Sequence, residues 1–313
     1  MSKDFPISWF SLLRRHMNGI RRVVSVVDKE AVPPAEFAKR CREFQQTAST
    51  HTDSLPMVAD SIWNAEGMAV AFGKRNLPDG SLQDPNIPRE TLGIVHVGYG
   101  IVCAEYARFD AGKLRQLVET KCVPNYRGFT YEGIGSALLL YEPGLFKLIN
   151  RALGIIPPNP TSGPSKEGFF AKFFSAFPPD AQRKLTHGYG RLTAFSRMNV
   201  HKAIRASAQL PQERVQPYVQ GLAVAFGMLN IQDIAKVLEH SDVVSPAPLR
   251  AYFQNGLIWV LAYCDWFAPG VLAAWKPQGK LEEFLVAKAR QESASNAKRG
   301  YPGVGILENP ITA

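Results

Sequence analysis

The sequence contains no uninterrupted apolar run near the length of about eighteen residues that a membrane-spanning helix requires. Its first apolar stretch is broken by Arg14 and Arg15, which removes the apolar core of a secretory signal. Cysteine is scarce, and no CxxC pair or Cys/His metal spacing occurs among Cys41, Cys103, Cys122 and Cys264. We therefore expect a reduced, cytoplasmic protein, with peripheral contact to a membrane as an open alternative.

Short catalytic motifs are absent as well. The sequence has no paired-acid DDxxD motif, no HExxH pair, no P-loop and no GxSxG elbow. Single histidines without a spacing signal are expected to be ordinary surface or core residues: His16, His51, His96, His201 and His240. The sequence therefore predicts no cofactor and leaves open whether the protein is an enzyme.

Acidic residues are outnumbered by basic ones, which gives a net charge of +9 and an isoelectric point near 9.4. A nucleic-acid-binding protein concentrates lysine and arginine on one face, whereas here the basic residues are dispersed along the chain. We therefore expect no specific binding of nucleic acid. The partners that the charge leaves open are a small hydrophobic or anionic ligand, or another protein.

An internal repeat is the strongest pattern in the chain. Residues 67–76 (GMAVAFGKRN) and 221–230 (GLAVAFGMLN) are identical at seven of ten positions. Weaker copies begin at four other glycines, so the landmark glycines are Gly67, Gly98, Gly133, Gly188, Gly221 and Gly256. Successive landmarks are separated by 31, 35, 55, 33 and 35 residues. A period near 34 residues is typical of arrays of paired helices.

Each landmark glycine follows a proline by nine to eleven residues, and these prolines are Pro56, Pro88, Pro124, Pro178, Pro211 and Pro246. Proline is tolerated in the first turn of a helix, where its missing N–H has no partner in any case. The pattern predicts a long helix that starts near each proline and ends eight to ten residues beyond the glycine. A shorter second helix is expected afterwards, for example at residues 113–118, 200–204 and 231–238.

Glycine in the middle of a helix costs about 1 kcal/mol relative to alanine. Close approach of a neighbouring helix explains its use here, because side chains would hold two backbones apart. A dinucleotide-binding loop does not fit, since no predicted strand precedes the glycines. We therefore predict an all-α fold, a superhelical array of about six helix pairs that resembles tetratricopeptide-type solenoids and is able to curl around a central cavity.

The expected organisation has five parts. Residues 1–50 hold a basic amphipathic helix (9–27) and a capping helix, and residues 51–152 hold repeats 1–3. Residues 153–177 form an insertion rich in Pro, Gly and Phe. Residues 178–290 hold repeats 4–6, and residues 291–313 form an extended tail. The basic helix either caps the array or docks on a membrane surface or acidic partner, and the insertion's phenylalanines either pack on the array or form a lid.

Polar residues precede five of the six landmark glycines: Glu66, Glu132, His187, Gln220 and Asn255. Equivalent positions in stacked repeats point the same way, so these side chains are expected to line one surface. Glu66, Glu132 and His187 are candidate catalytic residues for acid/base chemistry. The candidate ligand-binding residues are Gln220, Asn255, Tyr131, Tyr189, Phe170 and Phe173, and no metal is predicted. Alternatively, each polar group forms a hydrogen bond with the adjacent repeat.

Three short segments carry a family resemblance. Residues 126–133 (YRGFTYEG) resemble the RGFxxEGAAM signature of a family of unknown function from enediyne-type natural-product gene clusters. Residues 220–226 (QGLAVAF) are similar to that family's SGxGLAxAYAG stretch, and residues 187–191 (HGYGR) to its QGxGR stretch. Ile134, Gly135 and Ser136 depart from the signature. The resemblance implies a role in secondary metabolism and no particular activity.

The sequence therefore leaves two alternative functions. In the first, the array is a non-catalytic protein of secondary metabolism that binds a lipophilic biosynthetic intermediate or a partner protein on its concave face. In the second, it is an enzyme that acts by acid/base catalysis on a hydrophobic, isoprenoid- or polyene-like substrate in an enclosed pocket, for example a cyclase without the usual acidic motif. The shape of the cavity around the polar residues distinguishes the two.

Overall fold

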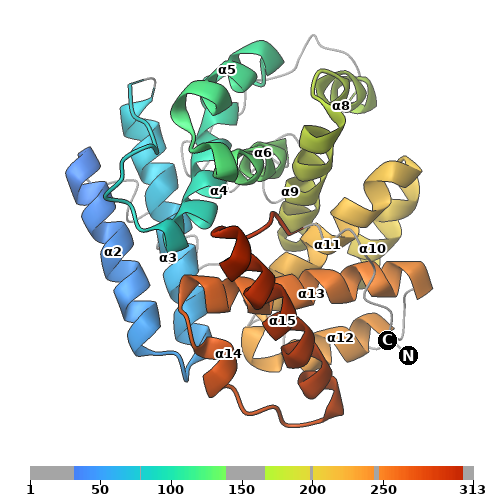
Figure 1. Ribbon diagram of the computed structural model, residues 1–313. Helices are drawn as coiled ribbons and strands as arrows, with labels where there is room; N and C mark the ends of the chain where they lie inside the picture. The colour runs from blue at the N-terminus through green and yellow to red at the C-terminus, as the bar shows by residue number, and fades with distance from the viewer. Residues whose placement is uncertain (1–31, 78, 139–165, 198–199, 243–246, 306–313) are drawn as a thin grey trace.

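The computed structural model describes residues 32–77, 79–138, 166–197, 200–242 and 247–305 (Figure 1). Within these ranges every regular element is a helix, which confirms the predicted all-α class. The long helices are α2 (Pro34–Thr50), α3 (Leu55–Asn76), α4 (Arg89–Tyr106), α6 (Arg127–Ala137), α9 (Pro179–Arg197), α11 (Gln212–Leu229), α13 (Ala247–Phe267) and α15 (Lys280–Arg299). Shorter helices are α5 (Ala111–Lys121), α8 (Lys166–Ser175), α10 (Val200–Ala206), α12 (Ile234–Asp242) and α14 (Val271–Ala274).

The prolines mark helix starts as predicted. Pro56 lies in the first turn of α3, Pro88 caps α4, and Pro211 caps α11. Pro124 opens a single 3-10 turn, Pro124–Tyr126, that leads directly into α6. The expected second helices at residues 113–118, 200–204 and 231–238 are also present, as α5, as α10, and as the 3-10 turn Ile231–Asp233 with α12. These four landmark prolines therefore mark the starts of helical segments, whereas Pro246 lies outside the described residues.

The long helices pack against one another in chain order, α3 on α4, α4 on α6, α6 on α9, α9 on α11 and α11 on α13. The same backbone contact recurs at each step. Gly188 in α9 lies against the carbonyl of Glu132 in α6, and Gly221 in α11 lies against the carbonyl of His187. A Cβ atom at either glycine would overlap that carbonyl. The mid-helix glycines therefore serve close approach of neighbouring backbones, as predicted.

Helix α13 brings the far end of the chain back to its beginning. In Figure 1 it runs across the middle of the molecule behind α15, and it contacts α2, α3 and α4 as well as α11. The hydroxyl oxygen of Tyr263 accepts a hydrogen bond from the Ile94 backbone N–H at 2.8 Å. Gly93 leaves room for this ring, since a Cβ there would lie 2.8 Å from the Tyr263 hydroxyl. Side chains of α13 consequently reach the space between the earlier helices.

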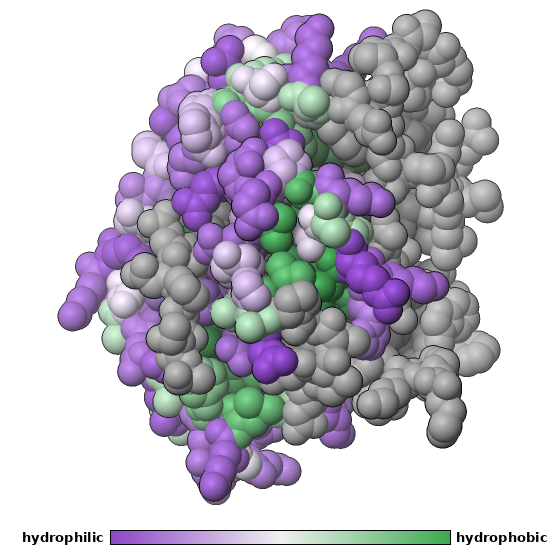
Figure 2. All heavy atoms as spheres, turned by 90° about the vertical axis from the view of Figure 1, so that its right-hand side faces the viewer, coloured by the Kyte–Doolittle hydropathy of each residue, from purple (hydrophilic) through white to green (hydrophobic). Residues whose placement is uncertain are grey.

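One hydrophobic core connects all of these helices, and α4, α11 and α13 contribute nearly continuous runs of buried residues to it. Figure 2 shows hydrophilic side chains over most of the coloured surface on the side of α8 to α12. Some hydrophobic side chains are also visible on this side. No single helix among the described residues is long and apolar enough to cross a bilayer, and the pair Gln212–Leu229 and Ile231–Leu238 meets that test only across a bend of 99°.

The predictions for segments outside the repeats are tested only in part by the described residues. The basic amphipathic helix expected at residues 9–27 lies outside the described residues. In the insertion, Phe173, Phe174 and Phe177 are buried, and the Phe173 ring contacts the rings of Phe174, Phe177 and Phe109. These rings therefore pack into the hydrophobic core. The side chain of Phe170 lies outside the described part.

The tail boundary expected at residue 291 is wrong. Helix α15 continues to Arg299, because its small residues, alanine and serine, are compatible with a helix and contain no breaker. The helix stops at Gly300, which adopts a left-handed conformation with φ of +76°. Only the residues after Gly300 are extended, and the structure describes them as far as Gly305.

Candidate active site

The three candidate catalytic residues meet in the interior. Glu66 comes from α3, Glu132 from α6 and His187 from α9, and their exposed fractions are 8%, 1% and 0%. They converge because each precedes a landmark glycine. The contact of Gly188 with the Glu132 carbonyl brings α6 and α9 together at the level of these residues. Their charged groups are linked through Arg191, a fourth residue that is 5% exposed.

Arg191 joins the two carboxylates. Its Nη2 and Nη1 atoms donate hydrogen bonds to the two carboxylate oxygens of Glu66 at 2.6 and 3.1 Å. Nη1 also lies 3.7 Å from Glu132 Oε1. The guanidinium stacks over the ring of Trp63 at 5.3 Å from its centroid, which adds a cation–π contact. Glu66 therefore holds Arg191 through two charge-assisted hydrogen bonds. The same guanidinium also attracts the nearby Glu132 carboxylate.

Glu132 and His187 form the second half of the cluster. Nδ1 of His187 lies 3.5 Å from Glu132 Oε1, which is within ion-pair distance but longer than a normal hydrogen bond. Oε2 of Glu132 and both ring nitrogens of His187 are buried and have no hydrogen-bond partner among the described residues. Of these three atoms only Nδ1 belongs to the ion pair, which leaves Glu132 Oε2 and His187 Nε2. A buried polar atom without a partner costs about 1–3 kcal/mol. These two atoms are therefore the reactive candidates of the cluster.

The charges set the protonation of the carboxylates. Burial alone would raise the pKa of Glu132, but His187 and Arg191 outweigh burial and lower it, so Glu132 is ionised. Burial raises the pKa of Glu66, and the Arg191 charge opposes that rise. Burial also acts against the charge on Arg191, but the two carboxylates raise its pKa further above its usual value.

Aromatic side chains form a wall beside His187. The Trp259 ring meets the imidazole edge to face at 6.5 Å, stacks on Tyr263 at 4.9 Å and lies 6.3 Å from Phe129. These rings come from α13 and α6, so the wall depends on the return of α13 to the early helices. The surroundings of the acid/base pair are therefore mainly apolar.

The remaining candidate residues lie in several helices. Gln220 and Asn255 are fully buried in α11 and α13, next to their landmark glycines. The Tyr131 ring contacts Phe177 at 5.8 Å, and Tyr189 contacts Tyr218 at 6.0 Å. Phe173 belongs to the phenylalanine cluster of the insertion. The structure thus gives Tyr131, Tyr189 and Phe173 packing contacts with other aromatic rings.

No group of three His, Cys, Asp or Glu side chains in the described ranges is arranged to hold a metal ion. The reason at the charged cluster is chemical, because the Arg191 guanidinium stands between the carboxylates of Glu66 and Glu132. That position is the one a cation would take. The cluster is therefore suited to proton transfer rather than to binding of a divalent ion.

Sequence reasoning missed Arg191, Trp259 and Tyr263. Arg191 could have been recognised from the sequence, since it lies four residues after His187 and therefore on the same face of the predicted helix. Trp259 and Tyr263 follow the last landmark glycine within a long apolar run, and nothing there distinguishes them from ordinary core residues. Only the return of α13 to α4 gives them their position.

His96 is a buried histidine with a structural role. Its Nδ1–H donates to the Leu92 carbonyl at 2.7 Å, and its Nε2 accepts from the Val123 N–H at 3.1 Å. Both ring nitrogens are satisfied in the neutral form, and a second proton would face the Val123 N–H. Burial lowers its pKa to about 4, against 6.5 in an exposed histidine. His96 therefore stays neutral in the folded protein at physiological pH.

This shift predicts a pH dependence of stability. Between pH 6.5 and 4 the unfolded chain binds a proton at His96 and the folded chain does not, so stability is lost as the pH falls. From pH 7 to pH 5 we expect a loss of about 2 kcal/mol, at 1.36 kcal/mol per pKa unit. Urea unfolding of the native chain and of His96→Gln at both pH values measures it. Equal losses in the two proteins would contradict the assignment.

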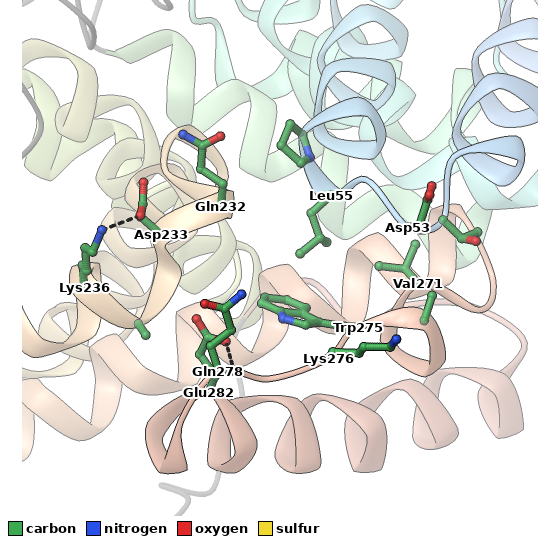
Figure 3. A pocket seen from close by; sticks show the side chains of 14 residues that line it. Asp53, Leu55, Gln232, Asp233, Lys236, Val271, Trp275, Lys276, Gln278 and Glu282 are labelled. Carbon is green, nitrogen blue, oxygen red and sulfur yellow. Dashed lines mark hydrogen bonds and ion pairs between the residues drawn. The ribbon is translucent and has the colours of Figure 1, made fainter.

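A separate groove lies on the surface between the start of α3, α12 and α14 (Figure 3). Its volume is about 570 Å3. Trp275 forms part of its floor, and Lys236 is paired with Asp233 at 2.8 Å along one side. None of the candidate catalytic or ligand-binding residues lines this groove.

Comparison with protein-family models, with curated proteins and with solved structures finds no match for this chain. The resemblance of residues 126–133, 187–191 and 220–226 to the family from natural-product gene clusters therefore stays a prediction.

Proposed function

We propose that the protein is an enzyme that transfers a proton to or from a hydrophobic substrate in its interior, with Glu132 and His187 as the acid/base pair. One observation carries the proposal. Glu132 Oε2 and His187 Nε2 are buried, lie in the same ion-paired cluster, and have no hydrogen-bond partner among the described residues. An ion pair that serves stability alone normally satisfies its remaining oxygens and N–H groups.

The four charged residues would have different roles in proton transfer. Ionised Glu132 faces Nδ1 of His187 and stabilises the imidazolium, so His187 Nε2–H gives its proton to the substrate and neutral Nε2 takes one back. Arg191 holds Glu132 in its ionised form, and Glu66 anchors Arg191 through two hydrogen bonds. Arg191 and Glu66 are therefore positioning residues. Trp259, Phe129 and Tyr263 would provide the apolar wall for the substrate.

Burial favours this enclosed arrangement over an open concave binding surface. All five polar residues that precede landmark glycines are buried: Glu66, Glu132, His187, Gln220 and Asn255. A concave face for a partner protein would expose such residues to solvent. A substrate next to them must enter an apolar interior, so we propose an isoprenoid- or polyene-like molecule and a reaction such as cyclisation that starts or ends with proton transfer.

The long helices would be copies of one ancestral unit. The supporting observation is the recurring contact in which a landmark glycine lies against the carbonyl of the residue before the preceding landmark. It occurs at Gly98 on Glu66, Gly133 on Val97, Gly188 on Glu132, Gly221 on His187 and Gly256 on Gln220. A role in secondary metabolism and a cytoplasmic location remain parts of the proposal that rest on the sequence.

Turnover in D2O tests the proposal. The native chain is incubated with isoprenoid diphosphates, squalene and conjugated polyene acids, and products are analysed by mass spectrometry for altered structure and deuterium uptake. We expect one of these classes to give a deuterated product. Glu132→Gln and His187→Ala are each expected to reduce the rate by about 10²–10⁴-fold, the usual contribution of a general acid or base.

The controls are exposed residues of the same types, Glu283→Gln and His51→Ala, which should leave the rate unchanged. Circular dichroism and thermal melting establish that each variant is folded. Unchanged turnover in folded Glu132→Gln and His187→Ala would contradict the acid/base assignment. Binding of a compound without any conversion by the native chain would also contradict it.

The second candidate function is non-catalytic binding of a partner or ligand, and the groove of Figure 3 favours it. Trp275 offers a flat apolar surface there, with Lys276 and Glu282 at its rim. This groove is open to solvent and lacks the buried acid/base pair. If the native chain retains a partner in a pull-down and Trp275→Ala releases it while Glu132→Gln does not, binding through the groove is the better description.

A further inference from the structure

The segment that follows α15 lies directly on the candidate active site. Residues 300–305 leave the helix at Gly300 and pass over α6 and α13. Tyr301 meets the Tyr126 ring edge to face at 6.4 Å, and Val304 rests on Gly128. Gly305 ends the described part and contacts both His187 and Trp259. We name residues 300–305 the strap.

The strap covers His187 without forming a hydrogen bond to its Nε2 atom. A Cβ on Gly305 would lie 2.6 Å from His187 Nε2, so the strap covers this nitrogen at close range. Nevertheless Nε2 has no hydrogen-bond partner among the described residues, and the imidazole is fully buried. The strap thus removes Nε2 from water without replacing the lost hydrogen bond, which costs free energy. A molecule with a polar atom at this place would satisfy Nε2 better than the strap does.

Trp259 shows which kind of group fits beside it. Its Nε1–H donates a hydrogen bond to the Gly303 carbonyl oxygen at 2.7 Å. The backbone of Gly303 to Gly305 is narrow, extended and almost free of side chains, and it lies against the aromatic wall. It therefore has the shape of an elongated, flat molecule with one acceptor oxygen.

The strap is held by few polar contacts. Among the described residues, the Gly303 N–H reaches Asn296 Oδ1 at 3.3 Å, a long hydrogen bond, and the Gly303 carbonyl uses the Trp259 bond already named. The left-handed Gly300 separates the strap from α15, and its surroundings are open. The remaining contacts are apolar: Tyr301 and Val304 pack against the core, and Pro302 is buried. Replacement of the strap by a ligand that takes over the Trp259 bond would leave α15 in place.

We propose that the space held by Gly303 to Gly305 is a ligand site for an elongated apolar molecule with a carboxylate or carbonyl oxygen. The oxygen replaces the Gly303 carbonyl at Trp259 Nε1, a polar group of the ligand reaches His187 Nε2, and the apolar chain lies on Phe129, Trp259 and Tyr263. The strap and the ligand exclude each other. This inference rests on the proposed function, since it names the substrate class of the same site.

A reversible lock on the strap tests the proposal. A Cβ at Gly128 would lie 2.7 Å from Val304 Cγ2, and disulfide-bonded Cβ atoms are about 3.5–4.5 Å apart. The double variant Gly128→Cys/Val304→Cys is therefore expected to form a disulfide that holds the strap on the site. The probe is cis-parinaric acid, a fluorescent conjugated tetraene with a carboxylate. We expect the native chain and the reduced variant to bind it, and the oxidised variant to bind it at least about tenfold more weakly.

Reduction with dithiothreitol is the matched control, because it changes the lock and nothing else in the sequence. Trp259→Phe in the otherwise native chain removes one hydrogen bond and should weaken probe binding about tenfold, as expected for about 1.4 kcal/mol. Equal affinity of the oxidised and reduced double variant would overturn the proposal. Absence of probe binding to the native chain, or unchanged affinity in Trp259→Phe, would overturn it as well.

Failure of this inference and failure of the proposed function give different results. Turnover of Glu132→Gln reports on the acid/base role, whereas probe binding to the oxidised and reduced double variant reports on the ligand site. If Glu132→Gln keeps full turnover while the lock blocks the probe, the ligand site stands and the acid/base role falls. If Glu132→Gln loses turnover while the lock leaves probe binding unchanged, the acid/base role stands without this site.

Discussion

Gly188→Ala is expected to prevent folding of the protein. A Cβ at this position of α9 would overlap the backbone carbonyl of Glu132 and lie 3.0 Å from its Cα atom. Backbone cannot turn away as a side chain can, so α6 and α9 would have to separate along their whole contact. We expect a loss of more than about 4 kcal/mol, a large fraction of the stability of an ordinary domain. Circular dichroism and thermal melting of the soluble fraction measure it.

Gly112→Ala is the matched control for this prediction. Gly112 is also a helical glycine, but it lies exposed in α5, and a Cβ there meets only Asp110 Oδ1 at 3.3 Å. Alanine is the better helix former, so this variant should melt at the native temperature or slightly above it. A Gly188→Ala protein that melts within a few degrees of the native chain would disprove the close-approach role of the glycine.

Arg191→Met is expected to destabilise the protein by about 3–5 kcal/mol, because it removes one partner of a buried ion pair. Glu66 would lose both of its hydrogen bonds from the guanidinium, and Glu132 would lose the positive charge that lies 3.7 Å from its Oε1 atom. Methionine fills much of the volume of the arginine stem, so the effect arises mainly from charge rather than from a cavity. Chemical unfolding at neutral pH gives the free-energy difference.

The double variant Glu66→Gln/Arg191→Met separates charge from packing. Removal of the carboxylate together with the guanidinium leaves no uncompensated charge on Glu66, so the double variant should be more stable than the sum of the single changes predicts. A coupling energy of about 0.5–3 kcal/mol is expected for residues in direct contact. Exposed Arg115→Met in α5 controls for loss of one positive charge and should have little effect. Strict additivity of Glu66→Gln and Arg191→Met would contradict the buried network.

The local structure was predictable because it depends on short-range chemistry. Proline at Pro88 and Pro211 fixes where a helix begins, and glycine at Gly188 and Gly221 reports where two backbones approach. Equal spacing from the glycines also placed Glu66, Glu132 and His187 at equivalent positions. Side chains at equivalent positions of neighbouring helices meet, and these three residues do lie in one cluster.

The rest depends on contacts between residues far apart in the chain. Arg191 is 125 positions from Glu66, and periodicity within one repeat does not indicate which charge will neutralise which. Trp259 is positioned by the return of α13 to the early helices, which depends on the packing of many helices together. The strap was predicted as a tail without a location, because glycine and proline after Gly300 show that the helix ends but not where the chain goes. These are the features that define the site.

The distance along the chain between Glu66 and Arg191 also has a consequence for folding. During synthesis α3 is made long before α9, so the Glu66 carboxylate has no guanidinium to neutralise it and remains in water. The Tyr263–Ile94 hydrogen bond spans 169 positions and forms later still. Such long-range closure slows folding, because the entropy of a large loop is lost before its contacts form. We therefore expect helices α3 to α6 to reach their native burial only after α9 and α13 have joined them, with folding as one cooperative unit rather than from the N-terminus forward.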